Sequence, residues 1–222
     1  MDPSSENRLL KRALALYAGE HVLEHVLRNG NDALRPQGEL TEATLLFVDV
    51  AGFTTSSKAM TPDDLTALIS SWLDLITTQL VVFDGTLDAY VGDAAAGWWR
   101  SGGDNDHAKR ACHCAIAMVA ELQKLNAQFR SKTWPEPTMR IGINTGFVRL
   151  GTYGTEKRLR YTALGDAVNL ASRLCGLANG QYSHSILLSD ATRNMVANDI
   201  PTIPVDTVMV KGRDLPMTIY AI

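Results

Sequence analysis

The sequence lacks three features that would place it in a special class of protein. Its 222 residues carry 21 Lys and Arg against 24 Asp and Glu, so it has no basic excess of the kind that broad nucleic-acid binding requires. Three cysteines, an odd number, predict free thiols and a reducing compartment. No apolar run approaches the ~20 residues that cross a bilayer, and the polar segment Met1–Arg12 does not resemble a secretory signal. We therefore expect a cytoplasmic globular protein that binds no nucleic acid.

The chain divides at a turn-rich segment, residues 29–38 (NGNDALRPQG). Before it, apolar residues at helical spacing predict either two short helices that meet near Gly19 or one long helix with a weak point there, because glycine costs ~1 kcal/mol inside a helix. We expect a helical arm with its linker over residues 1–38 and a larger domain over residues 39–222. The apolar positions of the arm resemble a short parallel coiled coil, which favours a dimerising or signal-transmitting role over simple packing on the same domain.

The larger domain mixes strand-like and helix-like segments. The apolar run at residues 43–50 predicts a buried central strand. Helices are expected at 62–83, with Thr61 as N-cap and Pro62 at the first position, and at 104–129 and 166–177. Strands are expected at 85–91 with 94–100, at 139–144 with 147–152, at 185–188, and at 205–210 with 217–222. Because several strand pairs are hairpins, the predicted fold class is α+β with a mixed or antiparallel sheet.

Two aspartates occupy positions where a metal site could form. Asp49 lies near the end of the predicted central strand, and Asp93 lies in the turn between the next two strands. Carboxylates at strand ends beside glycine-containing loops can hold hard cations while backbone N–H groups face phosphate oxygens. Two such acids are the minimum for two-cation phosphoryl transfer. The spacing alone is equally consistent with a structural role, in which Asp49 caps a loop and Asp93 supplies turn chemistry.

Five blocks, in order along the chain, resemble the motifs of class III nucleotide cyclase catalytic domains. They are residues 47–54 (FVDVAGFT), 85–94 (GTLDAYVGDA), 139–146 (MRIGINTG), 161–174 (YTALGDAVNLASRL) and 210–213 (VKGR). The resemblance is closest to bacterial-type adenylyl cyclases. It implies a ferredoxin-like βαββαβ core, and a homodimer in which two protomers pair head to tail and share each active site. Similar helical arms join family members to sensor or membrane modules, so an upstream or membrane-tethering module would lie outside this sequence.

The resemblance assigns one group of residues to the metals and the triphosphate. Asp49 and Asp93, aided by the carbonyl of Val50, would bind two Mg²⁺ or Mn²⁺ ions per site. The residues that would contact the triphosphate are Phe53 and Thr54, through their backbone, and Arg140.

The partner protomer would supply a second group of residues. The resemblance places Lys211 on the terminal phosphates, Asn169 on the ribose and Arg173 on the α-phosphate. The chemistry is consistent with these roles, because a bound cation lowers the pKa of the attacking 3′-hydroxyl, and pre-placed cations stabilise the charge that develops on the phosphates. Asn169 and Arg173 are four residues apart on a predicted helix, so they share one face.

The base-reading positions depart from the family pattern. Adenylyl members usually have a lysine four residues before the second metal acid, where this sequence has Ala89. The second position, Thr162, is found in one subclass of adenylyl cyclases. Loss of one base contact costs about 1–3 kcal/mol, so we expect weakened use of ATP and relaxed base selection. The leading interpretation is an adenylyl cyclase that forms cyclic AMP and pyrophosphate; the alternatives are a cyclase that also accepts GTP and a weakly active nucleotide-binding regulatory module.

Three other motifs have simpler structural explanations. Residues 21–25 (HVLEH) match an inverted zinc-peptidase pattern, but an amphipathic arm explains them better. Residues 112–114 (CHC) suggest a metal site, yet side chains at i and i+2 of a helix face apart. Trp98 and Trp99 end a predicted strand, where aromatic residues favour core packing or a dimer contact.

Overall fold

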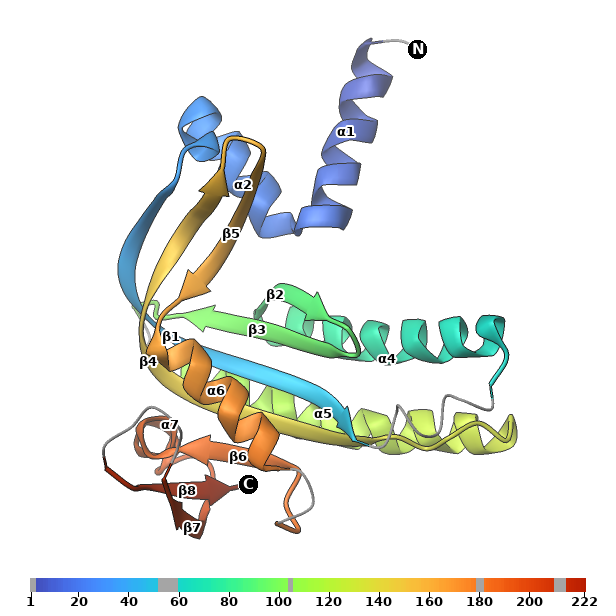
Figure 1. The fold of residues 1–222 in the computed structure, drawn as a ribbon, viewed down its shortest axis with the longest axis vertical. Coiled ribbons are helices and arrows are strands. Elements are labelled where there is room, and N and C mark those ends of the chain that lie inside the picture. The colour runs from blue at the N-terminus through green and yellow to red at the C-terminus, as the bar shows by residue number, and fades with distance from the viewer. Residues whose placement is uncertain (1–2, 52–59, 104–105, 179–181, 210–214) are drawn as a thin grey trace.

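The computed structural model describes residues 3–51, 60–103, 106–178, 182–209 and 215–222. Within these residues the strands form one eight-stranded sheet in the order β2-β3-β1-β4-β6-β8-β7, with β5 paired to β4 (Figure 1). The strands are β1 Gln37–Ala51, β2 Thr86–Val91, β3 Ala94–Arg100, β4 Thr138–Thr155, β5 Arg158–Leu164, β6 Ile186–Ser189, β7 Ile203–Val208 and β8 Met217–Ala221. The helices are α1 Pro3–Ala18, α2 Glu20–Asn29, the 3₁₀ turn η1 Gly30–Leu34, α4 Pro62–Val82, α5 His107–Ser131, α6 Asp166–Leu177 and α7 Asp190–Val196.

The first part of the domain is a ferredoxin-like core. In chain order it consists of β1, α4, β2, β3, α5 and β4, and its strands lie in the order β2-β3-β1-β4. β1 pairs antiparallel with both β3 and β4, whereas β4 and β6 are parallel. The mixed sheet confirms the predicted α+β class and the βαββαβ core.

The two faces of the sheet carry different layers of helices. Successive side chains of a strand point to opposite faces, and in β1 this alternation separates Leu46, Val48 and Val50 from Leu45 and Phe47. The first three residues pack with α4 and α5 in the main core. The other two belong to a second cluster with β5 and α6. We call this second surface the α6 face.

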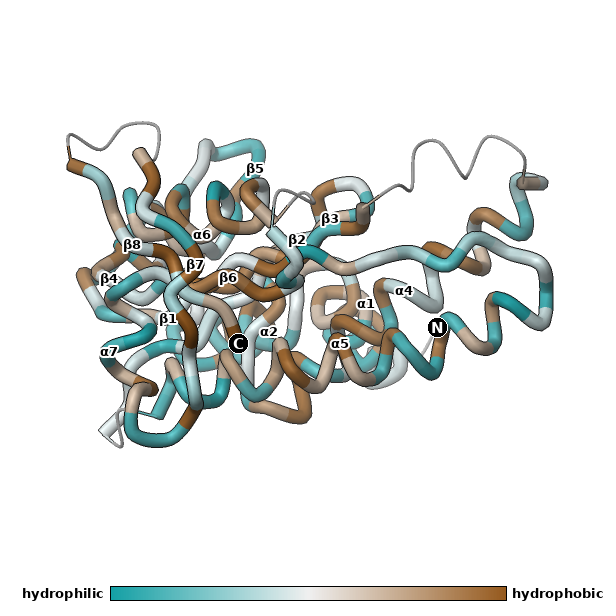
Figure 2. Tube along the Cα trace, turned by 90° about the horizontal axis from the view of Figure 1, so that it is seen from below, coloured by the Kyte–Doolittle hydropathy of each residue, from teal (hydrophilic) through white to brown (hydrophobic). Residues whose placement is uncertain are grey.

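Helix α4 forms as its sequence predicts. The Thr61 hydroxyl accepts the Asp64 N–H at 3.2 Å and Pro62 occupies the first turn. The side chains that α4 buries recur every fourth residue: Leu68, Trp72, Ile76 and Leu80. By length and composition alone α4 is apolar enough to cross a membrane, which corrects the expectation that no such run exists, but a core helix passes the same test. Figure 2 shows hydrophobic and hydrophilic residues interspersed along α4 and α5, as in helices that cover a sheet.

The strands predicted at 139–144 and 147–152 imply a turn at Thr145 and Gly146, and this prediction is wrong. β4 runs through both residues, and its hairpin partner is β5, a strand that the sequence analysis does not anticipate. The Thr145 hydroxyl is buried and lies 2.8 Å from the Thr44 hydroxyl. A Cβ added to Gly146 would lie 3.1 Å from the Cβ of Ala167 in α6. These small and polar residues therefore reflect tight packing against neighbouring elements and not a reversal of the chain.

The N-terminal arm consists of two helices that meet at Gly19, as one of the two alternatives predicts. Gly19 has φ 102°, and a Cβ there would lie 2.5 Å from the His21 ring, so both its backbone and its surroundings require glycine. α1 projects away from the sheet (Figure 1), leaving Leu16 and Tyr17 exposed. α2 instead packs on β5, with the rings of His21 and His25 centred 5.7 and 4.7 Å from the ring of Tyr161.

The three cysteines are free, as predicted, and all three are buried. Burial raises the pKa of Cys112, Cys114 and Cys175 to about 12. His113 lies between two of them but is exposed, because adjacent helical residues face different directions. In the described segments no group of three His, Cys, Asp or Glu side chains is placed to hold a metal ion, so neither the 112–114 motif nor the 21–25 motif forms a metal cluster there.

Packing of α2 on the sheet is expected to weaken in acid. The ring of His21 meets Trp98 edge-on at 6.0 Å, and its buried Nε2 has no hydrogen-bond partner among the residues that the structure describes. Burial lowers the pKa of His21 below its usual value of about 6.5, an effect that His25 reinforces and that Asp88 and Glu24 oppose. The unfolded chain therefore binds the proton more readily than the folded chain. The contribution of neutral His21 to the free energy of unfolding is complete above pH ~6.5 and is lost as the pH falls below that value.

The prediction is checked by thermal unfolding and amide exchange of α2 at pH about 7.5 and about 5.5. We expect a lower melting temperature and faster exchange at the acidic pH, and a smaller difference in His21→Phe, which keeps an apolar ring. His113→Phe is the control, because His113 is exposed. An unchanged pH dependence in His21→Phe would contradict the assignment to this residue.

Candidate active site

Asp49, Val50 and Arg140 meet at the end of β1. Asp49 pairs directly with Arg140 across the β1–β4 ladder. Nη2 of Arg140 donates to Oδ2 of Asp49 and, at 3.3 Å, to the carbonyl of Val50. The Val50 N–H donates to the other Asp49 oxygen at 2.7 Å. Both charged side chains are about one-quarter exposed, so the group lies at the surface of the α6 face, where a ligand can reach it.

Asp93 reaches the same end of the sheet from β3. The last registered pair between β1 and β3 is Val48 with Ala95, and both Asp49 and Asp93 lie just beyond it. Asp93 follows Gly92, whose φ of 67° suits glycine in this tight turn. The Asp93 carbonyl accepts the indole N–H of Trp72 at 2.8 Å, which fixes the turn against α4. The sequence predicts Asp49 near the end of one strand and Asp93 in the turn before a neighbouring strand, and the structure places them there.

The oxygen atoms at this end of the sheet suit a hard divalent cation. The Asp49 carboxylate and the Val50 carbonyl already converge on one positive group, the guanidinium of Arg140. Carboxylate and carbonyl oxygens are the ligands that Mg²⁺ and Mn²⁺ prefer. Since no complete cluster of three such side chains occurs among the described residues, the remaining ligands would come from water and from the phosphates of a substrate, as is usual for Mg²⁺. The donor set therefore fits the predicted metal ions.

Helix α6 carries Asn169 and Arg173 across the same face. It approaches β4 closely at Gly142, where a Cβ would lie 2.1 Å from the backbone N of Cys175 and 2.3 Å from the carbonyl oxygen of Ala171. Asn169 is exposed and Arg173 is half-buried. In the described part of the chain, Nη1 of Arg173 is buried without a hydrogen-bond partner. The helix thus presents, four residues apart, an exposed amide and a guanidinium with one buried N–H that has no partner among the described residues.

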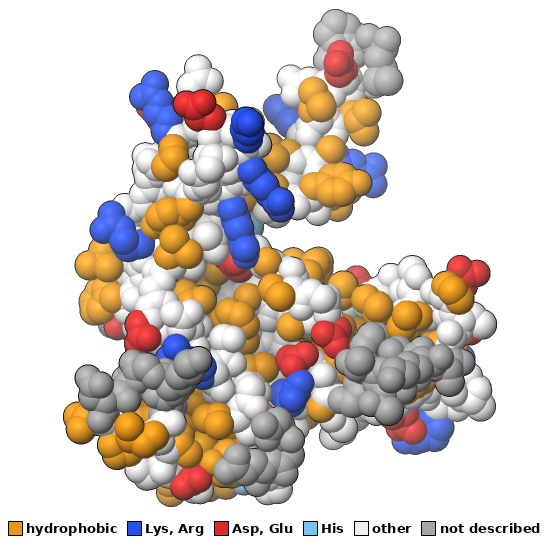
Figure 3. All heavy atoms as spheres, viewed as in Figure 1, with side chains coloured by type: hydrophobic (Ala, Val, Ile, Leu, Met, Phe, Trp, Pro, Cys, Tyr) orange, Lys and Arg blue, Asp and Glu red, His pale blue; other side chains and the backbone are white. Residues whose placement is uncertain are grey.

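A cavity of about 240 Å³ lies between β1, β2, β3, β5 and the first turn of α6. Its walls are mainly apolar, and its polar groups come from Asp88, Arg160 and Thr162. Thr162 is buried, and its hydroxyl donates to Oδ2 of Asp88 at 3.0 Å. Ala89 is not among the lining residues; Asp88, its neighbour, is. Figure 3 shows basic side chains in a line down β5, next to apolar side chains on the surface below.

Three of the predicted site residues lie outside the described residues. They are Phe53, Thr54 and Lys211. Their assignment to the triphosphate stays a prediction.

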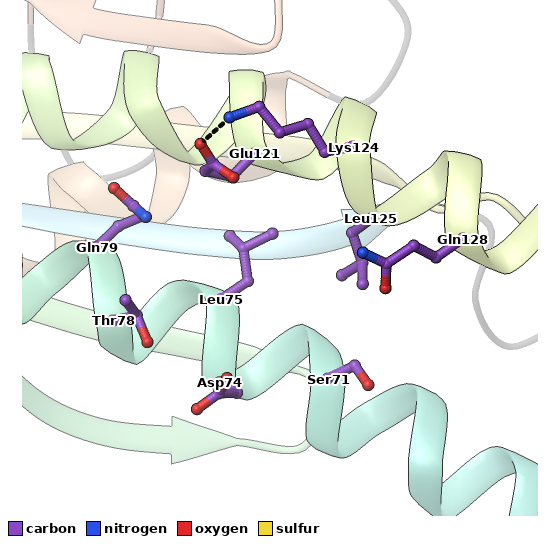
Figure 4. A pocket seen from close by; sticks show the side chains of 9 residues that line it. All are labelled: Ser71, Asp74, Leu75, Thr78, Gln79, Glu121, Lys124, Leu125 and Gln128. Carbon is purple, nitrogen blue, oxygen red and sulfur yellow. Dashed lines mark hydrogen bonds and ion pairs between the residues drawn. The ribbon is translucent and has the colours of Figure 1, made fainter.

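A second cavity, of about 320 Å³, lies between α4 and α5 (Figure 4). Polar side chains dominate its walls, among them Asp74 and Thr78 of α4 and Gln128 of α5. Lys124 and Glu121 form an ion pair of 2.6 Å along its edge. None of the predicted site residues lines this second cavity, which we call the second groove. Because it faces away from the cluster at Asp49, it is not the candidate site.

The fold and the residues on its α6 face are those expected of a nucleotide cyclase catalytic domain. The family model described as "Adenylate and Guanylate cyclase catalytic domain" matches residues 36–222. The chain belongs to this family.

Individual relatives and structures agree. The chain is 34% identical over 209 residues to adenylate cyclase 1 of Rhizobium meliloti (strain 1021), covering 94% of this chain and 31% of that protein. It spans about a third of the length of the curated relatives it matches. The crystal structure of the adenylyl cyclase CyaB from P. aeruginosa gives a TM-score of 0.78 at 30% identity, over 84% of this chain and 95% of that one. The guanylyl cyclase Cya2 gives 0.75 at 28% identity, over 84% and 93%.

Proposed function

We propose that this chain is the catalytic domain of a homodimeric adenylyl cyclase, which converts ATP to 3′,5′-cyclic AMP and pyrophosphate. The observation that carries the proposal is the cluster of Asp49, Val50 and Arg140, with Asp93 at the same end of the sheet. It combines ligands for divalent cations with a cation for phosphate. The named adenylate cyclases among the relatives favour ATP over GTP.

In this proposal Asp49, Asp93 and the Val50 carbonyl hold two divalent cations, Mg²⁺ or Mn²⁺. Bound there, such ions lower the pKa of a ribose 3′-hydroxyl and neutralise phosphate charge. Arg140 exchanges its present partner, the Asp49 carboxylate, for the triphosphate. This exchange costs little, because the pair is partly exposed to water.

The second set of groups acts on the ribose and the α-phosphate. The exposed amide of Asn169 orients the ribose, so that the 3′-hydroxyl faces the phosphorus. Arg173 offers an unpartnered buried N–H to the charge that develops on the α-phosphate. We propose that these two residues serve the metal acids of the partner protomer, so that each dimer has two shared sites.

Product analysis with ATP and GTP, each with Mg²⁺ and with Mn²⁺, tests the proposal. We expect cyclic AMP and pyrophosphate from ATP, and less cyclic GMP from GTP. The products are separated by chromatography and identified by mass. Equal turnover of both nucleotides would instead indicate a cyclase of relaxed base choice, which the alanine at position 89 favours. Nucleotide binding without any cyclic product would indicate a regulatory module.

A further inference from the structure

One carboxylate that lines the 240 Å³ cavity is nine-tenths buried, and the sequence motifs assign it no role. The side chain of Asp88 is 10% exposed, and it lines the cavity together with Thr162. Leu45, Phe47 and Trp98 contribute to the apolar walls. A charged group in such surroundings is costly unless its oxygens are hydrogen-bonded.

A β-bulge separates Asp88 from the regular ladder. Leu87 pairs with Gly97 and Ala89 with Ala96, so two steps along β2 match one step along β3. Asp88 is the extra residue. A bulge of this kind redirects a side chain that regular pairing would place elsewhere. Here Asp88, at the bulge, lines the cavity, whereas its neighbour Ala89 does not.

The two oxygens of Asp88 differ in their partners. Oδ2 accepts hydrogen bonds from both Arg160 and Thr162. Oδ1 is buried and has no hydrogen-bond partner among the described residues. Arg160 is about half exposed, so it compensates the carboxylate only in part. One acceptor is therefore left for a ligand that enters the cavity and brings an N–H donor.

The dimensions and walls of the cavity suit a flat ring system. At about 240 Å³ it is smaller than the ~300–1,000 Å³ pockets of drug-sized ligands, and therefore fits one base better than a whole nucleotide. Val168 lines it, and the next residue is Asn169, so a base in the cavity would place its ribose near that amide.

We propose that Asp88 is the base-selecting residue of this chain, and that its Oδ1 accepts a hydrogen bond from the 6-amino group of adenine. The proposal rests on the proposed function. An ionised carboxylate only accepts hydrogen bonds, so the 6-oxo group of a guanine or hypoxanthine ring would meet it as a second acceptor. Arg160 and Thr162 are positioning residues that hold the carboxylate in place.

The isosteric variant Asp88→Asn is expected to change the affinities for adenine and hypoxanthine nucleotides in opposite directions. Because Arg160 donates to the Oδ2 position, the amide oxygen takes that position and the amide NH₂ takes that of Oδ1. A donor then replaces an acceptor. We expect the affinity for ATP to fall about tenfold and the affinity for inosine triphosphate, which has a 6-oxo group, to rise.

Purine riboside triphosphate, which lacks the 6-amino group, isolates the contact. Wild-type protein should bind it about tenfold more weakly than ATP, and Asp88→Asn should bind it as wild type does. Affinities are measured by calorimetry, which needs no turnover, so failure of the cyclase proposal and failure of this one are distinguishable. Asp84→Asn, a change of an exposed carboxylate at the start of the same hairpin, is the matched control.

Three results would overturn the proposal. Equal wild-type affinity for ATP and purine riboside triphosphate would show that no group reads the amine, and this arm needs no variant to fold. If Asp88→Asn lowered the affinities for ATP and for purine riboside triphosphate equally, Asp88 would have a merely structural role. If calorimetry with GTP showed that Asp88→Asn weakens the binding of GTP and not that of ATP, the carboxylate would read the N–H groups of guanine instead.

Discussion

Replacement of Asp49 by asparagine is expected to reduce formation of cyclic nucleotide about a thousandfold, which corresponds to ~4 kcal/mol of transition-state stabilisation. Asparagine keeps the shape of the side chain but loses the negative charge that a divalent cation requires. The amide oxygen of asparagine can still accept the hydrogen bond from Arg140, so we expect the substitution to cost the fold little. The loss should therefore appear in the rate and not in the melting temperature. Single-turnover measurements with ATP at saturating Mn²⁺ check it.

The matched control for Asp49→Asn is Asp74→Asn. Asp74 is an exposed carboxylate of α4 that borders the second groove. It should retain full activity. Wild-type turnover by Asp49→Asn, in protein that melts normally, would remove Asp49 from the metal site and leave it the loop-capping role that its position also permits.

Mixing two inactive variants is expected to restore activity. Asp49→Asn damages the metal side of every site, and Arg173→Ala removes the guanidinium of α6. If each site combines the two sides from different protomers, a mixed dimer keeps one intact site. After exchange of subunits half of the dimers are mixed and each has one working site of two, so the mixture should reach about one-quarter of wild-type activity.

Each variant assayed alone is the control for that result. Its activity gives the background, which should remain about a thousandfold below wild type for Asp49→Asn. A mixture no more active than this background, under conditions where size measurements show subunit exchange, would place both sides of the site in one protomer.

Local patterns were enough to predict much of this fold. The Thr61–Pro62 start of α4, the turn at Gly92 and the break at Gly19 each depend on residues adjacent in sequence. The 139–152 segment is different, because its small residues pack against helices that are distant in sequence. Gly146 faces Ala167 of α6, and the Thr145 hydroxyl lies 3.1 Å from that of Thr192 in α7. A glycine needed for packing and a glycine needed for a turn look alike in one sequence.

The candidate site divides in the same way. Asp49 and Asp93 could be proposed as metal ligands because Asp49 lies near the end of a recognisable strand and Asp93 follows Gly92 in a turn. The role proposed for Asp88 could not be predicted, because it depends on a one-residue bulge and on Arg160 of a strand that local patterns missed. The one available signal was a charged residue within a strand-like run. Arg140 was predicted to bind phosphate, and its contact with Asp49 follows only from the β1–β4 register.

The contact at Gly142 has a consequence for how this domain tolerates sequence change. Main-chain atoms of α6 and β4 set the separation between helix and strand there, and side-chain volume has little part in it. Substitutions among the apolar side chains of α6 should then alter stability well before they displace Asn169 and Arg173. The positions of Asn169 and Arg173 are therefore expected to tolerate sequence changes in the core. This tolerance depends on the absence of a side chain at Gly142.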